Sequence, residues 1–491
     1  MALGFKLPQQ TVGSLVYTAQ AVTPSGYSAL RIFPDYGNLS ATPTWSSIVD
    51  VGPGYSDTNT RQVVRTSGGV VYVVVIAAVL NGSGASSIRM YKGSPAGNPT
   101  SFAEVAAASR PSNSIRFGAV EARIGSSGTL IDVVYEDDAT FQMVYRQFNT
   151  STDTWGTAEN IVALAGFTNN RYLSKLSMAL DANSVPHVLY GASNGSTLSY
   201  TNRIGGAWSA PVVVSTKTSV RRTGCVFDSS GNLHAGYWSD TPPTITYRQR
   251  QSSGTWLAEE TVDNVDVTGT ADDQGVSVCL NGSNQPVLFY AGLSVNPDGN
   301  TYQIRVRTAA STFTNLNPPG AVGHSPAGFV DAGGHIYAFI GHDDSPIEPF
   351  VIVRNAGTQI WGAYTQLAPN PPPTRDSSAN ICYDSLRPSA EIDFICMEEQ
   401  ISSTGETWYV HGSAPTPGWV DFIIEVDNGA GFEFYTGCRW EGGQTFNKAT
   451  GLPTTAMPVF ETPLASLTGK PVRMFVRPQT PTLVGTAVEV L

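Results

Sequence analysis

Arginines recur along the chain at intervals that indicate a binding site for an anion. Five of them are the candidates for that site: Arg61, Arg116, Arg171, Arg222 and Arg375. The planar guanidinium group binds carboxylate, sulfate or phosphate through two parallel hydrogen bonds, which a lysine ammonium cannot reproduce. The chain contains only six lysines, so arginine is its main cation. We therefore expect these arginines to hold an anionic ligand.

Aspartates are the second group of candidate ligand-binding residues. The predicted ones are Asp240, Asp273 and Asp343. In the alternative interpretation the arginines and acids only pair with one another, because loop ends collect charge in any protein. The acids do not follow the D-x-[DN]-x-[DN]-G spacing of a calcium loop. We predict no metal and no cofactor, and we assign no catalytic residue.

An internal repeat determines which elements position these residues. An aromatic residue follows a short polar turn at a spacing of 48 to 57 residues. The seven aromatics are Trp45, Phe102, Trp155, Trp208, Trp256, Phe313 and Trp361. Between them the same order returns: an apolar strand, a turn rich in Asp, Asn, Ser and Gly, an alternating strand, a loop and a third strand. Units of about 50 residues with four strands are typical of a β-propeller.

The sequence therefore predicts an all-β protein with a seven-bladed β-propeller over residues 1–415. The segment around Trp45 would supply an outer strand to the closing blade and so tie the ends of the ring together. Eight blades remain possible, because residues 29–33 could compete for a place beside the strand of Trp408. The repeat stops at a proline-bounded linker, and residues 416–491 are predicted to form a small C-terminal β-sandwich.

Propeller topology brings the candidate residues together. In an antiparallel four-stranded blade, the start of the first strand and the end of the second strand lie on the same rim. Arg61 and Arg116 precede first strands, whereas Asp240 and Asp343 follow second strands. One face of the disc should therefore carry an inner set of arginines and an outer ring of acids.

Other recurring residues have structural interpretations. Arginines recur on the predicted third strands, as at Arg203 and Arg305, and we interpret them as edge charges that deter pairing between molecules. His187 and His234 occupy equivalent second-strand positions and should be packing residues. The repeated aromatics should be wedges between blades.

Composition excludes several classes of protein. Charged residues make up 14% of the chain and the net charge is −11, so a basic nucleic-acid-binding surface is not expected. The longest apolar run, residues 70–80, is shorter than the roughly 20 residues that cross a bilayer, and we predict no membrane insertion. Five cysteines without CxxC spacing indicate buried thiols rather than a disulfide framework.

The unit from Asp228 to Tyr237, followed by Tyr247-Arg248 and Gly254-Thr255-Trp256, resembles the sialidase-like, or BNR-repeat, propellers. The resemblance covers roughly residues 14 to 415. It implies a propeller that belongs with exo-sialidases, polysaccharide lyases or non-catalytic lectins. The Asp-box S-x-D-x-G-x-T-W of sialidases is only partly present, at residues 151–155 and 252–256. No tyrosine and glutamate nucleophile pair can be placed. The tail from Gly418 to Leu491 resembles the accessory β-sandwiches found beside such propellers.

Two functions are consistent with these residues and motifs. The first is a non-catalytic recognition and assembly protein, a homo-oligomer in a bacteriophage virion that binds surface glycan or neighbouring virion proteins. It rests on the missing motifs, on the lysine-poor composition and on an analogy of fold. The second is a glycoside hydrolase or polysaccharide lyase acting on acidic glycans, in which arginines fix a carboxylate and an acid protonates the leaving group. The expected location is the virion, or the extracellular space as the alternative.

Overall fold

The structure is a computed structural model, and it describes two separate parts of the chain. Its two compact units are a propeller unit (Thr44–Arg354 with Trp361–Ala414) and a second unit (Met1–Pro43, Asn355–Ile360 and Pro415–Leu491). Within residues 44–414 the structure describes all residues except 47–48, 55–60, 78–85, 114–116, 126, 138, 164–175, 192–196, 216, 242, 265–275, 294–299, 319–323, 332–333, 342–348, 355–358, 360, 363, 368–376, 383–390, 399–405 and 414. Elsewhere it describes only the backbone of the strands named below.

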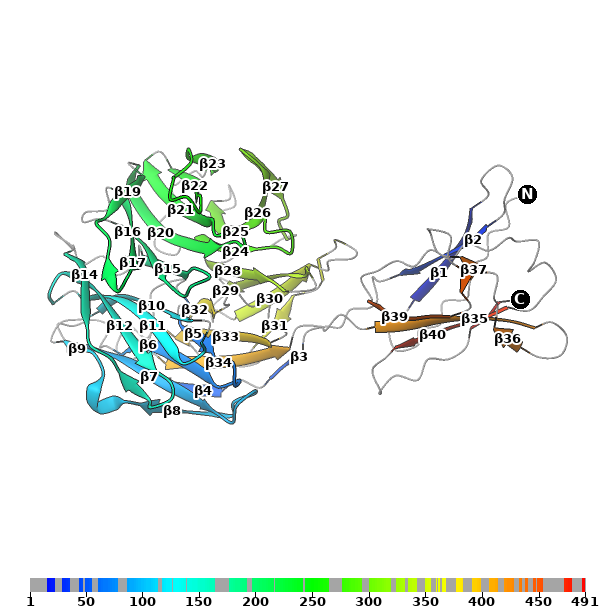
Figure 1. The fold of residues 1–491 in the computed structure, drawn as a ribbon, viewed down its shortest axis with the longest axis horizontal. Helices are drawn as coiled ribbons and strands as arrows, with labels where there is room; N and C mark the ends of the chain where they lie inside the picture. Colours follow the sequence, from blue (N-terminus) through cyan, green and yellow to red (C-terminus); the bar gives the residue numbers. More distant parts are fainter. Residues whose placement is uncertain are drawn as a thin grey trace. The chain divides into compact units, whose positions relative to one another are not determined.

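Seven antiparallel sheets make up the propeller unit, and in six of them the strands follow one another along the chain (Figure 1). The first blade contains β5 (Val63–Arg65), β6 (Val71–Ala77), β7 (Ser86–Ser94), β8 (Ser101–Val105) and β9 (Ser112–Asn113). The second contains β10 (Phe117–Ile124), β11 (Leu130–Asp137), β12 (Gln142–Asn149), β13 (Thr154–Trp155) and β14 (Glu159–Ala163). The third contains β15 (Leu176–Leu180), β16 (Pro186–Gly191), β17 (Leu198–Ile204), β18 (Ala207–Trp208) and β19 (Val212–Ser215).

The fourth blade contains β20 (Thr218–Phe227), β21 (Leu233–Thr241), β22 (Pro243–Arg250) and β23 (Glu260–Asn264). The fifth contains β24 (Val276–Leu280), β25 (Pro286–Leu293), β26 (Asn300–Ala309) and β27 (Thr312–Asn315). The sixth contains β28 (His324–Val330), β29 (Ile336–Gly341), β30 (Pro349–Arg354) and β31 (Thr365–Gln366). The seventh contains β32 (Ser377–Cys382), β33 (Glu391–Glu398) and β34 (Glu406–Ser413), with β3 (Thr44–Trp45) and β4 (Val49–Pro53). One three-residue 3-10 turn, Ala107–Ser109, is the only helical element among the described residues.

The inner strands form a closed circle. Each one contacts the inner strand of the next blade, and β32 of the seventh blade contacts β5 of the first. Their apolar runs are buried between neighbouring blades. A strand that is covered on both faces has a continuous hydrophobic sequence. β6, the second strand of the first blade, shows this most clearly, because its sequence VYVVVIA is buried at every position. The predicted seven-bladed, all-β fold is confirmed.

The N-terminal strands β3 and β4 complete the seventh blade. Thr44 and Trp45 pair with Ser413 and Gly412 of β34, and β4 pairs with the other end of the same strand. Residues 29–35, which could have competed for this place, instead form β2 (Ala29–Asp35) and pair with β1 (Val16–Val22). The described residues therefore contain seven blades and not eight. The predicted boundary between residues 415 and 416 stays a prediction.

The repeated aromatics act as wedges between blades, as their spacing predicted. Tyr145 of β12 contacts Trp208 of the third blade edge-on, with ring centroids 5.4 Å apart. Arg203 of that third blade lies over the same Tyr145 ring and forms an ion pair with Glu159 of β14. In the same way, Tyr247 of the fourth blade contacts Phe313 and Arg307 of the fifth. Two of the third-strand arginines interpreted as edge charges, Arg203 and Arg305, instead pair with carboxylates of the preceding blade, whereas Arg146 and Arg248 contact groups of their own blade.

The turns between first and second strands repeat one local structure. The side-chain oxygen of Asp181 accepts hydrogen bonds from the backbone N–H groups of Asn183 and Val185. The side-chain oxygens of Asp228 and Asn281 likewise accept hydrogen bonds from the backbone N–H groups two and four residues later in the chain. Asp and Asn favour such turns because their short side chains satisfy nearby backbone donors. These turns lie at the face opposite the one where the inner strands begin.

The strands of the second unit are also antiparallel. Besides β1 and β2 they are β35 (Trp419–Asp427), β36 (Phe432–Phe434), β37 (Cys438–Arg439), β38 (Thr445–Phe446), β39 (Lys448–Pro453), β40 (Val472–Pro478) and β41 (Val488–Val490). β35 pairs with β36, β39 and β40, and β40 also pairs with β41, so that these five strands form one sheet. β37 and β38 form a two-stranded sheet.

Candidate functional site

Only one of the eight predicted site residues has a described side chain. This residue is Arg61, which lies two residues before β5. Arg222 lies in β20 and Asp240 in β21, but their side chains are not described. The remaining five predicted residues lie outside the described residues: Arg116, Arg171, Arg375, Asp273 and Asp343. Their grouping on one face stays a prediction.

Arg61 connects blades across the centre of the propeller. Its backbone carbonyl accepts a hydrogen bond from the N–H of Ala122 in the second blade, at 2.8 Å. Its side chain, in a residue only 9% exposed, donates from Nη2 to the carbonyl oxygen of Val278 in the fifth blade, at 2.7 Å. A guanidinium group that joins the first blade to the fifth must lie close to the propeller axis.

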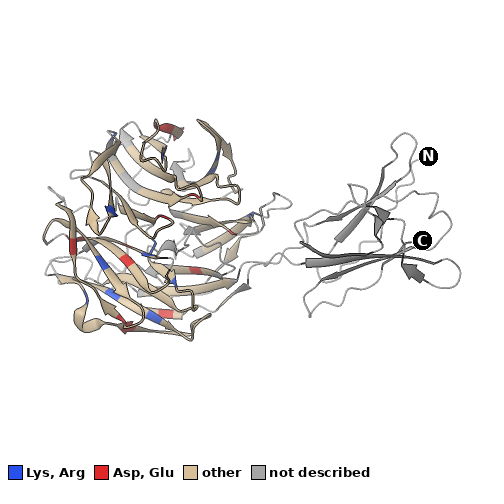
Figure 2. Cartoon of the chain, viewed as in Figure 1, with Lys and Arg blue, Asp and Glu red and all other residues tan. Residues whose placement is uncertain are grey.

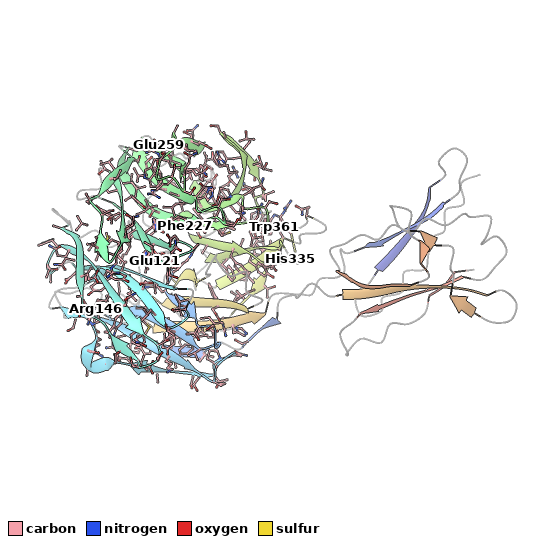
Figure 3. The ribbon with its side chains drawn as sticks, viewed as in Figure 1. Glu121, Arg146, Phe227, Glu259, His335 and Trp361 are labelled. Atoms are coloured by element: carbon pink, nitrogen blue, oxygen red, sulfur yellow. The ribbon has the colours of Figure 1, made fainter. Side chains whose placement is uncertain are left out.

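A buried ion pair on β10 lies near Arg61. Arg123 pairs with Glu121 through a short hydrogen bond, and the other oxygen of Glu121 accepts the backbone N–H of Met178 in the third blade at 2.6 Å. Burial raises the pKa of Glu121, while the charges of Arg123 and Arg61 oppose that rise. Glu121 lies near the middle of the ring of blades in Figure 3. We call Arg61, Glu121 and Arg123 the axial cluster.

The axial cluster gathers guanidinium groups in an acidic protein. The overall charge of the chain is −11, and Figure 2 shows how few charged residues the propeller strands contain. Two buried arginines at the propeller axis are therefore a distinctive feature of this molecule. Burying charge in a protein interior is costly. The carboxylate of Glu121 offsets part of this cost.

Several polar atoms near the inner strands have no hydrogen-bond partner among the described residues. They are both amide atoms of Gln62, the hydroxyl of Thr223 and Nε of Arg123. Gln62 has no exposed surface, although buried polar groups in proteins almost always have partners.

A second polar cluster lies over the junction of the third and fourth blades. The Nζ of Lys217 donates to the hydroxyls of Thr244 and Thr246 in β22, at 3.0 and 2.7 Å. Ser239 of β21 is in hydrogen-bond contact with Thr244 at 2.9 Å. Burial lowers the pKa of Lys217, and the charge of Glu259 opposes that shift. Because Lys217 directly precedes an inner strand, this cluster lies on the same face as Arg61.

Sequence reasoning missed Glu121, Arg123 and Lys217. The first two lie at alternate positions of the apolar strand β10, and this interruption of a buried strand by charge was a usable signal. Lys217 carried no such signal, because its partners Thr244 and Thr246 come from another strand and are ordinary residues in the sequence.

A tyrosine and glutamate pair is present, but it is placed for packing. Tyr237 donates to Oε1 of Glu259 at 2.7 Å. Tyr237 is completely buried, and burial raises its pKa far above the usual value. A nucleophilic phenolate needs access to substrate and a lowered pKa, so Tyr237 does not fit the role of a sialidase nucleophile.

The two predicted packing histidines are buried and hydrogen-bonded. Nδ1 of His187 lies 2.6 Å from the hydroxyl of Tyr200, and Nδ1 of His234 lies 2.6 Å from that of Tyr247. Within the described residues, no group of three or more His, Cys, Asp and Glu side chains could hold a metal ion. No helix in the same residues is long and apolar enough to cross a bilayer.

Comparison with known proteins gives similarity to solved structures only. No family model matches the sequence, and no curated protein matches it. An ulvan lyase bound to -[GlcA(1-4)Rha3S]- has a TM-score of 0.46 and 10% identity, over 76% of this chain and 96% of that one. An α-L-arabinanase of Penicillium chrysogenum has a TM-score of 0.42 and 11% identity, over 76% and 99%. The Aleuria aurantia lectin, in complex with α-methyl-L-fucoside, has a TM-score of 0.40 and 16% identity, over 66% and 96%.

These findings correct two of the sequence-based predictions. The similar structures include polysaccharide lyases, an arabinanase, arabinofuranosidases and a lectin, so the prediction of a bacteriophage virion protein is wrong. That prediction rested on composition and fold analogy, and one fold serves unrelated functions. The resemblance to BNR-repeat sialidases is confirmed only as far as the seven-bladed propeller, since no family model supports the finer assignment.

Proposed function

We propose that this protein is a carbohydrate-active propeller that binds an acidic glycan at the face where its inner strands begin. The observation that carries the proposal is the buried guanidinium group of Arg61, which lies two residues before the first inner strand and reaches across the propeller axis to Val278. Arg123 pairs with Glu121 nearer the other end of β10, and the amide of Gln62, beside Arg61, has no hydrogen-bond partner among the described residues. Guanidinium groups bind the carboxylates of uronates and the sulfates of sulfated sugars in the same bidentate manner.

The low charge of the rest of the molecule favours selective binding at this place. The chain is acidic overall, so a polyanion is repelled by most of the surface and attracted where arginines gather. In the proposal Arg116, which directly precedes β10, adds to this attraction, together with Arg222 within β20. Exposed charges are screened within about 10 Å at 0.1 M salt, so binding should weaken as salt is added.

The test is a calorimetric titration with matched oligosaccharides. We expect a polygalacturonate or chondroitin sulfate tetrasaccharide to bind, and a neutral arabinan tetrasaccharide to bind at least about tenfold more weakly. Arg222→Ala should weaken binding of the acidic sugar without lowering the melting temperature, and Lys92→Met is the matched control for loss of one cation elsewhere. Equal binding of the acidic and neutral sugars, or binding of neither, would contradict the proposal.

Cleavage of the glycan is the second candidate function. The observation in its favour is Glu136, a carboxyl group only 4% exposed at the end of β11, on the same face as Arg61. A buried carboxyl group is suited to donate a proton to a leaving group. Incubation with a fluorogenic sialoside, and with polygalacturonate followed by ultraviolet absorbance of an unsaturated product, would detect hydrolysis or β-elimination. Activity lost in Glu136→Gln supports cleavage, whereas no turnover of any acidic substrate leaves binding as the function.

A further inference from the structure

We propose that Lys217 and the hydroxyls beneath it form a second anion subsite, which takes a sulfate or carboxylate substituent of the glycan over the junction of the third and fourth blades. This inference rests on the proposed function, because it names a further residue and a further contact for the same ligand. Nothing in the sequence pattern marks Lys217, and the case for it comes from the contacts that its ammonium makes.

The ammonium lies on a fixed platform of hydroxyl groups. Thr244 and Thr246, which accept its hydrogen bonds, project from the same face of β22, and Ser239 lies opposite Thr244 on β21. All three hydroxyl residues are buried, whereas Lys217 itself is partly exposed. A cation held from below in this way is oriented and remains open to solvent on its other side.

The partners of Lys217 leave its charge available. An ammonium group has three N–H donors, and two of them go to neutral hydroxyls. In the described part of the chain, no carboxylate lies within ion-pair distance of Lys217. Lys92 offers a direct contrast, because it pairs with Asp153 at 2.7 Å and this hydrogen bond raises its pKa. Arg203 and Arg307 are likewise neutralised by Glu159 and Glu260.

The hydroxyl groups do not need the lysine as a partner. Ser239 contacts Thr244 at 2.9 Å, and Thr244 contacts Thr246 at 3.3 Å, so the three hydroxyls already form a chain of hydrogen bonds. If Lys217 had a structural role alone, an apolar side chain of similar length would therefore serve equally well at this position. The cost of keeping a half-buried ammonium charged is repaid when an anion binds to its free N–H.

The carboxylate whose charge acts on Lys217 is that of Glu259, and this carboxylate is hydrogen-bonded elsewhere. Glu259 accepts the hydroxyl of Tyr237 at 2.7 Å and only influences Lys217 through its charge. The hydroxyl groups beneath Lys217 lie on β21 and β22, the second and third strands of the fourth blade, whereas the axial cluster lies on and beside the inner strands. The subsite is thus separate from the axial cluster.

Competitive acetylation followed by mass spectrometry tests the subsite directly. With six lysines in the chain, each modified peptide can be assigned. We expect a chondroitin sulfate tetrasaccharide to reduce labelling of Lys217 at least about fivefold and to leave Lys92 unchanged. The same labelling with unsulfated chondroitin shows which group Lys217 binds. Protection by this sugar indicates a carboxylate, and loss of protection indicates a sulfate. If concentrated inorganic sulfate protects Lys217 and the tetrasaccharide does not, the site holds an adventitious ion only, and the proposal is overturned.

Variants keep the two proposals distinguishable. Lys217→Met should weaken binding of the tetrasaccharide about tenfold, Lys217→Arg should restore most of it, and Lys92→Met should have no effect. If the wild-type protein binds the tetrasaccharide and Lys217→Met binds it equally well, the subsite is wrong while the proposed function stands. If the wild-type protein binds no acidic glycan, the proposed function fails, and with it the subsite.

Discussion

At the residue scale, the cations of this protein divide by what they contact. Arg203, Arg307 and Lys92 each form an ion pair with a carboxylate and hold neighbouring elements together. Lys217 instead donates to neutral hydroxyl groups. The ion-paired cations contribute to packing, and in the proposal Lys217 contacts the ligand. Residue type alone does not separate them, because the difference lies in their partners.

His187 allows a prediction for the effect of pH on stability. Burial lowers its pKa to about 4, and the charge of Asp181 opposes the shift while that of Arg250 adds to it. The unfolded chain, in which histidine has its ordinary pKa of about 6.5, then binds a proton that the folded chain does not. Neutral His187 therefore makes its full contribution to the free energy of unfolding above pH 6.5. As the pH falls toward 4, the free energy of unfolding decreases by roughly 2 to 4 kcal/mol through this residue. Urea titrations across this range should show a shallower pH dependence for His187→Gln, and an unchanged dependence would contradict this assignment.

At the element scale, the blade was predictable and its outer strand was not. The turn aspartates and the aromatic period depend on local structure, so sequence spacing revealed the four-strand unit. The outer position is split in several blades, as in β13 and β14, which pair with different parts of β12. This division into two short strands depends on how the outer segment bends along β12. The axial cluster was missed for a related reason, since the register of separate blades decides that Glu121 meets Met178.

Trp155 tests the packing role of the repeated aromatics. Its ring contacts Phe148 of its own blade edge-on at 5.2 Å, and the Arg146 guanidinium lies over it at 5.6 Å. Phe148 in turn contacts Tyr72 of the first blade, with ring centroids 5.8 Å apart. Trp155→Ala should destabilise the propeller by about 3 to 5 kcal/mol, because a buried aromatic is replaced by a cavity. Trp155→Phe should cost less than about 1.5 kcal/mol, since the indole N–H has no partner among the described residues. Urea unfolding followed by circular dichroism measures both, and equal losses would show that ring packing is not the cause.

At the scale of the whole propeller, one buried network joins the first blade to the last. Arg65 of β5 donates to both oxygens of Asp393 in β33, with Nε to Oδ2 at 2.7 Å, and Tyr409 of β34 donates to the same carboxylate. His411 of β34 lies beside it. Ring closure by an N-terminal strand was predicted from the Trp45 position. This network was not predicted, because its members are far apart in sequence and become neighbours only when the circle closes.

Removal of the Asp393 charge should weaken ring closure. Burial raises the pKa of Asp393, but hydrogen bonds from His411, Arg65 and Tyr409 outweigh burial and hold it below its usual value. Asp393→Asn should lower the free energy of unfolding by about 3 to 5 kcal/mol at neutral pH, since Arg65 loses the carboxylate that compensates its buried charge. The stabilising effect is present above the ordinary aspartate pKa of about 4 and is lost as the pH falls through the lower folded pKa. The wild type and the variant should therefore converge in acid.

The control for Asp393→Asn is the more exposed pair of Lys92 and Asp153. Lys92→Met should cost less than about 1 kcal/mol, as is usual for pairs open to solvent. A loss as large as that of Asp393→Asn would mean that the closing network has no special importance.

The central claim is that an acidic glycan binds on the face where the inner strands begin. Hydrogen–deuterium exchange with and without a chondroitin sulfate tetrasaccharide tests it most directly, because peptides report on both faces at once. We predict slower exchange in peptides that contain Arg61, the start of β10 and Lys217, with no change in the turns at Asp181 and Asp228 on the opposite face. Slower exchange confined to those turns, or no change in any peptide at saturating sugar, would contradict the claim.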